Sequence, residues 1–209
     1  MKIAYIHQFF CTPKGSSGTR SYDVSKHLAS MGHQVTMICG VTDNSGLEMA
    51  PWYRPFRRFR MDGIDVILCN VLYSNHQGVL LRTLSFAKFA LLATIALCLF
   101  VPKVDVVFAT SLPLTVGIPG YVGARWHRAS FVFEVRDICP ESDVIAGYLE
   151  QGSVLERILA FLEWFFYVKA DRILLVSPGF QKRLAERGYA PAKLRTVLLG
   201  ADGSLFRDI

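Results

Sequence analysis

Short runs of apolar residues alternate with helix-like patterns along most of the chain. The runs are rich in Val, Ile, Leu and Phe and do not alternate strictly with polar residues, as expected for strands covered on both faces. A helical pattern over 21–31 has Val24 and Leu28 on one face and stops at Gly32. This order predicts an α/β fold with a doubly wound parallel sheet and right-handed crossovers. The predicted strands are 2–7, 34–39, 64–71, 105–109, 130–135, 172–176 and 195–199.

The segment 78–101 is predicted to form a long helix with very few charges. Arg82, Ser85 and Lys88 lie at three-residue spacing and form a thin polar stripe, and the next charged residue is Lys103. That uncharged run is shorter than the ~20 residues needed to span a bilayer. We expect a helix that packs on the sheet and leaves some apolar surface for a membrane. A fully buried crossover helix is the alternative, and a transmembrane helix is the least favoured of the three.

A second helix, predicted over 153–169, has an apolar arc around most of its circumference. Glu156, Glu163 and Tyr167 share one face. So wide an arc indicates burial on the sheet, alone or together with a partner or lipid surface. We expect most of its apolar side chains to pack in the core.

Composition indicates a packed globular chain, because 52% of the residues are apolar and 19% are charged. The net charge of +6 is clustered, and the stretch 52–60 interleaves aromatic residues with arginines that include Arg57 and Arg58. Such a stretch suits an anionic lipid surface or a polyphosphate, and an ordinary solvated loop is the alternative. Nucleic-acid binding is disfavoured because no recognition-helix, RNP or zinc-finger pattern is present.

The cysteines and the start of the sequence bear on the cellular compartment. The five cysteines are widely spaced and include no C-x-x-C, which argues against a disulfide framework or a zinc site and favours a reducing cytosol. Residues 2–7 already read as a strand, with no signal peptide in front. We expect a cytoplasmic protein that binds no metal.

The loop after the first predicted strand is one candidate for ligand binding, since ligands of open parallel sheets bind beyond the carboxyl ends of the strands. His7 is placed at that crevice by the strand end. Gly15, Ser16 and Gly18 belong to a small-residue loop that enters a helix, where backbone N–H groups can approach an anion. Arg20 could add a bidentate phosphate contact. An ordinary strand–helix turn is the alternative, because the loop matches neither G-x-G-x-x-G nor a Walker A motif.

Charged residues at the end of the predicted strand 130–135 form a second candidate. Glu134, Arg136 and Asp137 end an apolar run. Burying such charges is costly unless they form ion pairs or take part in binding or catalysis. Asp137 could accept a proton from an acceptor hydroxyl while Arg136 holds a phosphate or tunes the carboxylate. A Glu134–Arg136 or Arg136–Asp137 pair that only fixes the loop is the alternative. The segment 109–115 offers hydroxyls for sugar contacts, with a weaker signal.

The chain resembles, in order from end to end, the N-terminal domain of GT-B glycosyltransferases of family four. The likeness is greatest to a bacterial O-antigen and capsule branch that includes N-acetyl-fucosamine transferases. Its most specific part is 133–142, with the sequence FEVRDICPES. The other matching segments are 6–10, 15–20, 32–36, 63–66, 169–172, 176–180 and 200–206.

This resemblance implies two Rossmann-like domains with the active site between them. The N-terminal domain would hold the acceptor, usually a polyprenyl-diphosphate-linked sugar at the inner face of the cell membrane, and the C-terminal domain would hold the nucleotide-sugar. Transfer would retain the anomeric configuration, without a metal or other cofactor. The resemblance favours Asp137 over Arg136 for a base role. Arg57, Arg58, Arg82 and Lys88 are then the expected membrane contacts.

The length of the chain matches only part of such an enzyme. Residues 1–200 are predicted to be the acceptor-side domain, and 201–209 the start of an interdomain linker, with the nucleotide-sugar domain absent. We therefore expect little or no transferase activity from this chain alone. A membrane-surface binding or scaffold module is the main alternative. A nucleotide-sugar dehydrogenase or epimerase is disfavoured, because the first loop lacks the dinucleotide fingerprint and the second strand ends at Gly40 rather than at an acidic residue.

Overall fold

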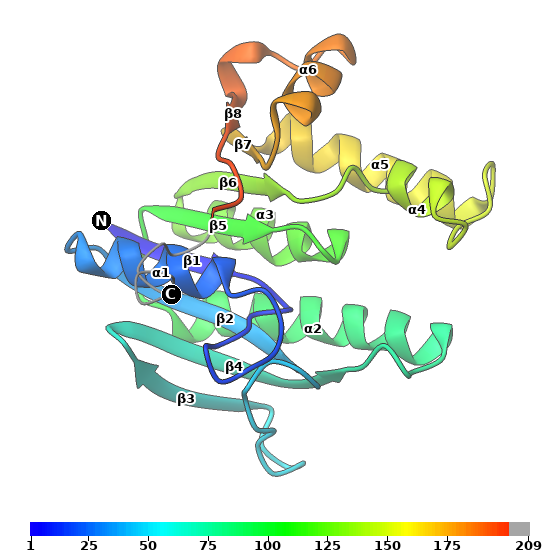
Figure 1. Cartoon of the computed structure of the whole chain (residues 1–209). Coiled ribbons are helices and arrows are strands. Elements are labelled where there is room, and N and C mark those ends of the chain that lie inside the picture. Colours follow the sequence, from blue (N-terminus) through cyan, green and yellow to red (C-terminus); the bar gives the residue numbers. More distant parts are fainter. Residues whose placement is uncertain (201–209) are drawn as a thin grey trace, which may run out of the picture.

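An eight-stranded sheet forms the centre of the computed structural model, which describes residues 1–200; the predicted linker, 201–209, lies outside the described residues. The strand order is β3-β4-β2-β1-β5-β6-β7-β8 (Figure 1). All neighbouring strands are parallel except β3 and β4. The predicted doubly wound α/β fold is confirmed. The strands are β1 (Lys2–Ile6), β2 (Gln34–Thr42), β3 (Phe56–Met61), β4 (Ile64–Tyr73), β5 (Val106–Thr110), β6 (Ser130–Val135), β7 (Arg172–Leu175) and β8 (Leu194–Thr196).

Helices cover both faces of the sheet, which explains why the strands are apolar on both sides. Along β1, Ile3 and Tyr5 belong to a core shared with α1, whereas Ala4 and Ile6 belong to a core shared with α2, α3 and α5. The helices are α1 (Arg20–Ser30), α2 (Val79–Phe100), α3 (Gly117–His127), α4 (Glu141–Ile145), α5 (Val154–Lys169) and α6 (Pro178–Glu186), with short 3-10 turns at Leu114–Val116 and Pro191–Lys193.

Close packing between α2 and α3 depends on a glycine. A Cβ atom at Gly123 would lie 1.9 Å from Cδ2 of Leu97, which is fully buried. A larger residue would push the two helices apart, and overpacking of this kind is destabilising. The sequence pattern did not predict α3 as a helix, because it begins with three glycines and a proline within eight residues, and these residues disfavour helices in isolation.

Two predictions from the sequence are corrected by the fold. The arginine–aromatic stretch is not simply a loop, because its second half is the edge strand β3, antiparallel to β4. In α5, fewer apolar side chains pack in the core than expected: Leu159, Leu162, Phe165 and Phe166 do, whereas a similar number are exposed. Glu163 and Tyr167 are the buried side chains, each 1% exposed, together with Phe166. The exposed ones are Val154, Leu155, Ile158, Phe161, Trp164 and Val168.

Candidate active site

The chain order in the sheet reverses between β1 and β5. From β1 the chain builds outward through β2 to β4 and β3, and it then returns to place β5, β6, β7 and β8 on the other side of β1. At such a reversal the loops diverge, and a crevice opens outside the carboxyl ends of the strands. His7, after β1, and Thr110, at the end of β5, lie at this point. The two strongest sequence candidates, 7–20 and 131–142, therefore meet at one edge.

A buried ion pair links those two segments. Nε and Nη2 of Arg20 lie 3.0 and 2.9 Å from Oε1 of Glu134, whose side chain is 2% exposed. Thr110 donates its hydroxyl proton to Oε2 of Glu134 at 2.8 Å. The Tyr5 hydroxyl lies 3.1 Å from Thr110 Oγ1 and therefore donates to it. Burial, and then the Glu134 charge, raise the pKa of Tyr5, so this hydroxyl keeps its proton.

Arg20 also holds the chain that follows β8. Its Nη1 donates to the carbonyl oxygen of Leu198 at 2.9 Å and its Nη2 to that of Val197 at 3.1 Å. The guanidinium is thus satisfied by protein acceptors, and a phosphate at this position would have to compete with them. Neither ion pair considered from the sequence forms, because Glu134 pairs with Arg20 and not with Arg136. In this structure Glu134 and Arg20 fix the crevice floor.

His7 lies at the predicted position but is buried, with 1% exposure. Its Nδ1 is 2.8 Å from Oγ of Ser21, at the start of α1. Burial, and to a smaller extent the positive charge of Arg136, lower the pKa of His7 to about 3. The imidazole is therefore neutral at physiological pH and acts as a hydrogen-bonding group between β1 and α1.

The lowered pKa of His7 predicts a stability that depends on pH. An unfolded histidine has a pKa of about 6.5. Below about pH 6.5, His7 is therefore protonated in the unfolded chain but neutral in the folded chain. As a result, the free energy of unfolding falls as the pH drops from about 6.5 towards 3. The slope from this residue is about 1 kcal/mol per pH unit. Chemical unfolding at pH 7 and pH 5 should show a smaller loss in His7→Gln than in the unchanged chain, and equal losses in both would contradict this account.

Arg136 and Asp137 follow β6 at the same edge of the sheet and have hydrogen-bonding capacity left for a ligand. Both side chains are half-buried. The backbone N–H of Arg136 donates to Oγ of Ser111, whereas its guanidinium has no hydrogen bond or ion pair within residues 1–200. Burial raises the pKa of Asp137, while Arg136 opposes and Asp143 reinforces that rise. A cation beside a carboxylate of raised pKa suits binding of an anionic substrate next to a proton acceptor.

The small-residue loop is only partly available to a ligand. The N–H of Gly15 donates to the carbonyl of Thr12, and the N–H of Ser16 donates to that of Asn44. Any side chain at Gly15 would clash with Asn44, because its Cβ would lie 2.2 Å from the carbonyl oxygen. Gly18 is exposed and has open space around it. Of the three predicted loop contacts, Gly18 is thus the one placed to let a ligand approach the start of α1.

A cavity of about 250 Å³ at the same edge adds residues that the sequence analysis did not single out. Phe9 and Tyr73 line it with ring centroids 4.6 Å apart, and Asn44 and Asn75 contribute amides. Aromatic faces with amide groups are suited to hold a sugar ring. Tyr73 ends β4 and Asn75 follows it, so the rule about carboxyl ends could have identified both from the sequence.

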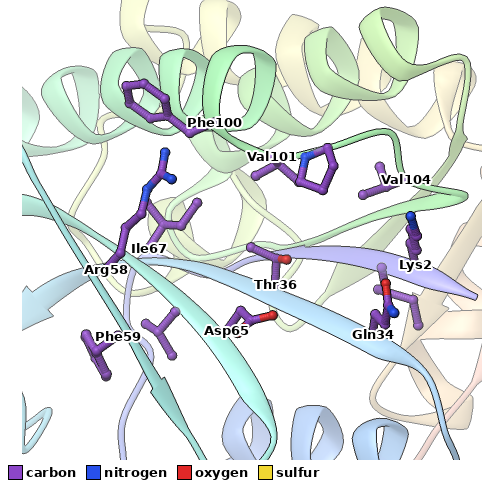
Figure 2. A pocket seen from close by; sticks show the side chains of 13 residues that line it. Lys2, Gln34, Thr36, Arg58, Phe59, Asp65, Ile67, Phe100, Val101 and Val104 are labelled. Atoms are coloured by element: carbon purple, nitrogen blue, oxygen red, sulfur yellow. The ribbon is translucent and has the colours of Figure 1, made fainter.

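A second hollow, of about 390 Å³, lies at the opposite edge of the sheet (Figure 2). Lys2, Gln34 and Asp65 line it from the beginnings of their strands. Figure 2 shows the guanidinium of Arg58 beneath the ring of Phe100, 4.6 Å from its centroid. Ligands of open α/β sheets bind at the carboxyl edge, so this hollow is not a candidate active site.

The predicted membrane contacts are divided between two regions. Arg57 and Arg58 lie on β3, where Arg57 stacks on Phe59, 5.5 Å from its ring centroid. Arg82 and Lys88 lie on α2; Arg82 is half-buried over the Tyr73 ring, and Lys88 is exposed. The helix α2 is long and apolar enough to cross a membrane by length and composition, with 33% of its most apolar window buried in the protein. Among the described residues, no cluster of side chains suited to a metal is found.

Comparison with known proteins identifies the class. The family model for the glycosyl transferase 4-like domain matches residues 15–200. The chain therefore belongs to this family of glycosyltransferase domains. No curated protein matches it significantly in sequence.

Solved structures show the same fold at low sequence identity. Sucrose-phosphate synthase from Thermosynechococcus elongatus superposes with a TM-score of 0.62 at 13% identity, over 98% of this chain and 49% of that one. Anabaena HepE in complex with UDP and glucose gives a TM-score of 0.53 at 16% identity, over 99% and 46%. The chain thus spans about half the length of these structures, and its sheet matches one GT-B glycosyltransferase domain.

Proposed function

We propose that the chain is the acceptor-side domain of a retaining glycosyltransferase. It would move a hexosyl or N-acetylhexosaminyl group from a nucleotide-sugar to a polyprenyl-diphosphate-linked acceptor, in O-antigen or other surface polysaccharide biosynthesis. The nucleotide-sugar would bind mainly to a second domain across the crevice. Anabaena HepE binds UDP, which supports a nucleotide-sugar donor for a chain of this fold.

The observation that supports this proposal most is the state of Arg136. Its guanidinium lies half-buried after β6, next to β5 at the same edge of the sheet, without a partner in the described chain and directly before Asp137. A diphosphate is the acceptor group that would complete its hydrogen bonds. Asp137 would then receive the proton of the acceptor hydroxyl. The cavity beside Phe9 and Tyr73 would hold the acceptor sugar, and no metal is needed in this scheme.

The proposal is tested by sugar transfer from a panel of nucleotide-sugars to a polyprenyl-diphosphate-sugar. The chain is assayed alone and together with a nucleotide-sugar-binding domain encoded downstream of it. We expect product only when both are present, and the productive donor identifies the sugar. Robust transfer by the chain alone would contradict the assignment of nucleotide-sugar binding to a second domain. No transfer in either case, with every donor, would contradict a glycosyltransferase role.

A membrane-surface or scaffold module is the second candidate, at the inner face of the cell membrane. It is favoured by the apolar side chains that α2 and α5 expose, including Leu91 and Trp164 at 62% and 50% exposure. Such a module would bind lipid with no transfer under any donor. The transfer assay therefore separates the two candidates, since both predict binding to a membrane.

A further inference from the structure

The helical layer of α2, α3 and α5 leaves an apolar surface uncovered. The helix α3 packs against both neighbours, and all three lie along the same side of the sheet (Figure 1). Their side chains that point away from the sheet form what we call the outer face. Its exposed large apolar members include Leu91 and Leu99, Trp126, Phe161 and Trp164. Large exposed apolar patches mark sites of contact with a membrane or another protein.

The helix α5 buries one charged side chain beside Leu159, Leu162 and Phe166, which pack in the core, and exposes large apolar side chains on its outer side. Its acidic residue Glu163 is buried and accepts two hydrogen bonds from Arg187, at 3.2 and 2.8 Å. Phe161 and Trp164 on the same helix are 59% and 50% exposed. Placing a charge in the core and aromatic residues outside is unfavourable in water. The arrangement is favourable where the outer side of the helix meets an apolar medium.

The charges on the outer face are of one sign. Within α2, α3 and α5, the exposed charged side chains are Lys88, Arg125, Arg157 and Lys169. There is no acidic residue in α2 or α3, Glu163 is buried, and Glu156 is half-buried in the first turn of α5. Apolar side chains flanked by cations complement a surface that is apolar below a layer of negative charge. This is the chemistry of an anionic lipid bilayer.

Polar groups along α2 are satisfied within the protein. The hydroxyl of Thr83 donates to the carbonyl of Val79 at 2.9 Å, and that of Thr94 donates to Ala90 at 2.7 Å. Ser85 donates to the carbonyl of Leu72. Because no hydroxyl needs water, contact with lipid carries little desolvation cost.

We propose that the outer face of α2, α3 and α5 lies flat on an anionic membrane, with Trp126 and Trp164 at the lipid interface. The crossover helix α2 runs antiparallel to the strands, so the strands also lie along the bilayer. The carboxyl edge of the sheet then faces sideways, parallel to the membrane plane. The crevice then opens along the membrane surface. The functional value of this orientation rests on the proposed function. A polyprenyl tail could stay in the lipid while its diphosphate reaches Arg136.

The three tryptophans of the chain, Trp52, Trp126 and Trp164, provide the test. Trp52 is 92% exposed in the loop before β3, outside the outer face. Single-tryptophan variants are mixed with phosphatidylglycerol–phosphatidylethanolamine vesicles whose acyl chains carry bromine. We expect quenching of Trp126 and Trp164 and none of Trp52. Quenching of Trp52 alone would assign docking to the arginine–aromatic stretch 52–60 and overturn the proposal, as would no binding to these vesicles.

A pair of variants that each introduce a carboxylate provides a second readout. Phe161→Glu should weaken binding to these vesicles by about tenfold or more, because a carboxylate loses apolar contact and is repelled by anionic headgroups. Trp52→Glu should leave binding unchanged. Both sites are exposed, so thermal midpoints should match the unchanged chain. Dimerisation without lipid that Phe161→Glu abolishes, with no vesicle binding, would assign the face to a second copy and overturn the proposal. These measurements need no donor or acceptor, so failed sugar transfer does not affect them.

Discussion

Replacing Arg20 with methionine is expected to lower the free energy of unfolding by about 3–5 kcal/mol, because it leaves a buried carboxylate without its cation. Glu134 is 2% exposed, and Thr110 would be its remaining side-chain partner. The substitution also removes the two hydrogen bonds that hold the carbonyls of Val197 and Leu198. Denaturant unfolding at neutral pH measures the effect.

An exposed ion pair in the same sheet provides the matched control. Arg60 lies 3.7 Å from Asp65, and their side chains are 72% and 61% exposed. Arg60→Met should therefore cost less than about 1 kcal/mol. The double variant Arg20→Met, Glu134→Gln should recover part of the loss, since it removes the uncompensated charge. Equal effects of Arg20→Met and Arg60→Met would show that the buried pair contributes nothing beyond a surface pair.

The pairing of Arg20 with Glu134 explains where sequence reasoning stops. The sequence shows that both residues lie at or after the ends of predicted strands. Because parallel strands put their carboxyl ends at one edge of the sheet, it also predicts that they lie at the same edge. The two residues are 114 positions apart, however, and their contact depends on the order β1-β5-β6 in the sheet. Strand order is a property of tertiary packing that apolar runs do not encode. Local pairs such as Glu134–Arg136 were therefore considered, whereas the real partner was not.

The helix α5 illustrates a related limit. Periodicity predicts which side chains share a face, and Glu163 and Tyr167 do share one. It does not say which face is inside. In the fold, Arg187 follows α6 and compensates the buried Glu163 charge on the inner face. The strand β3 was missed for another reason, because arginines are tolerated on an edge strand that has one neighbour, β4.

The largest predicted effect on activity is at Asp137. If the chain acts as proposed, then together with a nucleotide-sugar-binding domain Asp137→Asn should lower kcat/KM by about 100-fold or more, because an amide cannot accept the proton of an acceptor hydroxyl. Asp65→Asn, at the opposite edge of the sheet, should leave transfer unchanged. Initial rates at saturating donor and varied acceptor measure both variants.

The pH profile separates proton transfer from simple positioning. Burial raises the pKa of Asp137, so its carboxylate form is lost as the pH falls through a value above that of an ordinary aspartate. The unchanged enzyme should show an acidic limb in kcat/KM that is displaced upward accordingly. Asp137→Asn should lose that limb while keeping its residual rate. If the variant retained both the limb and most of its activity, Asp137 would not be the base.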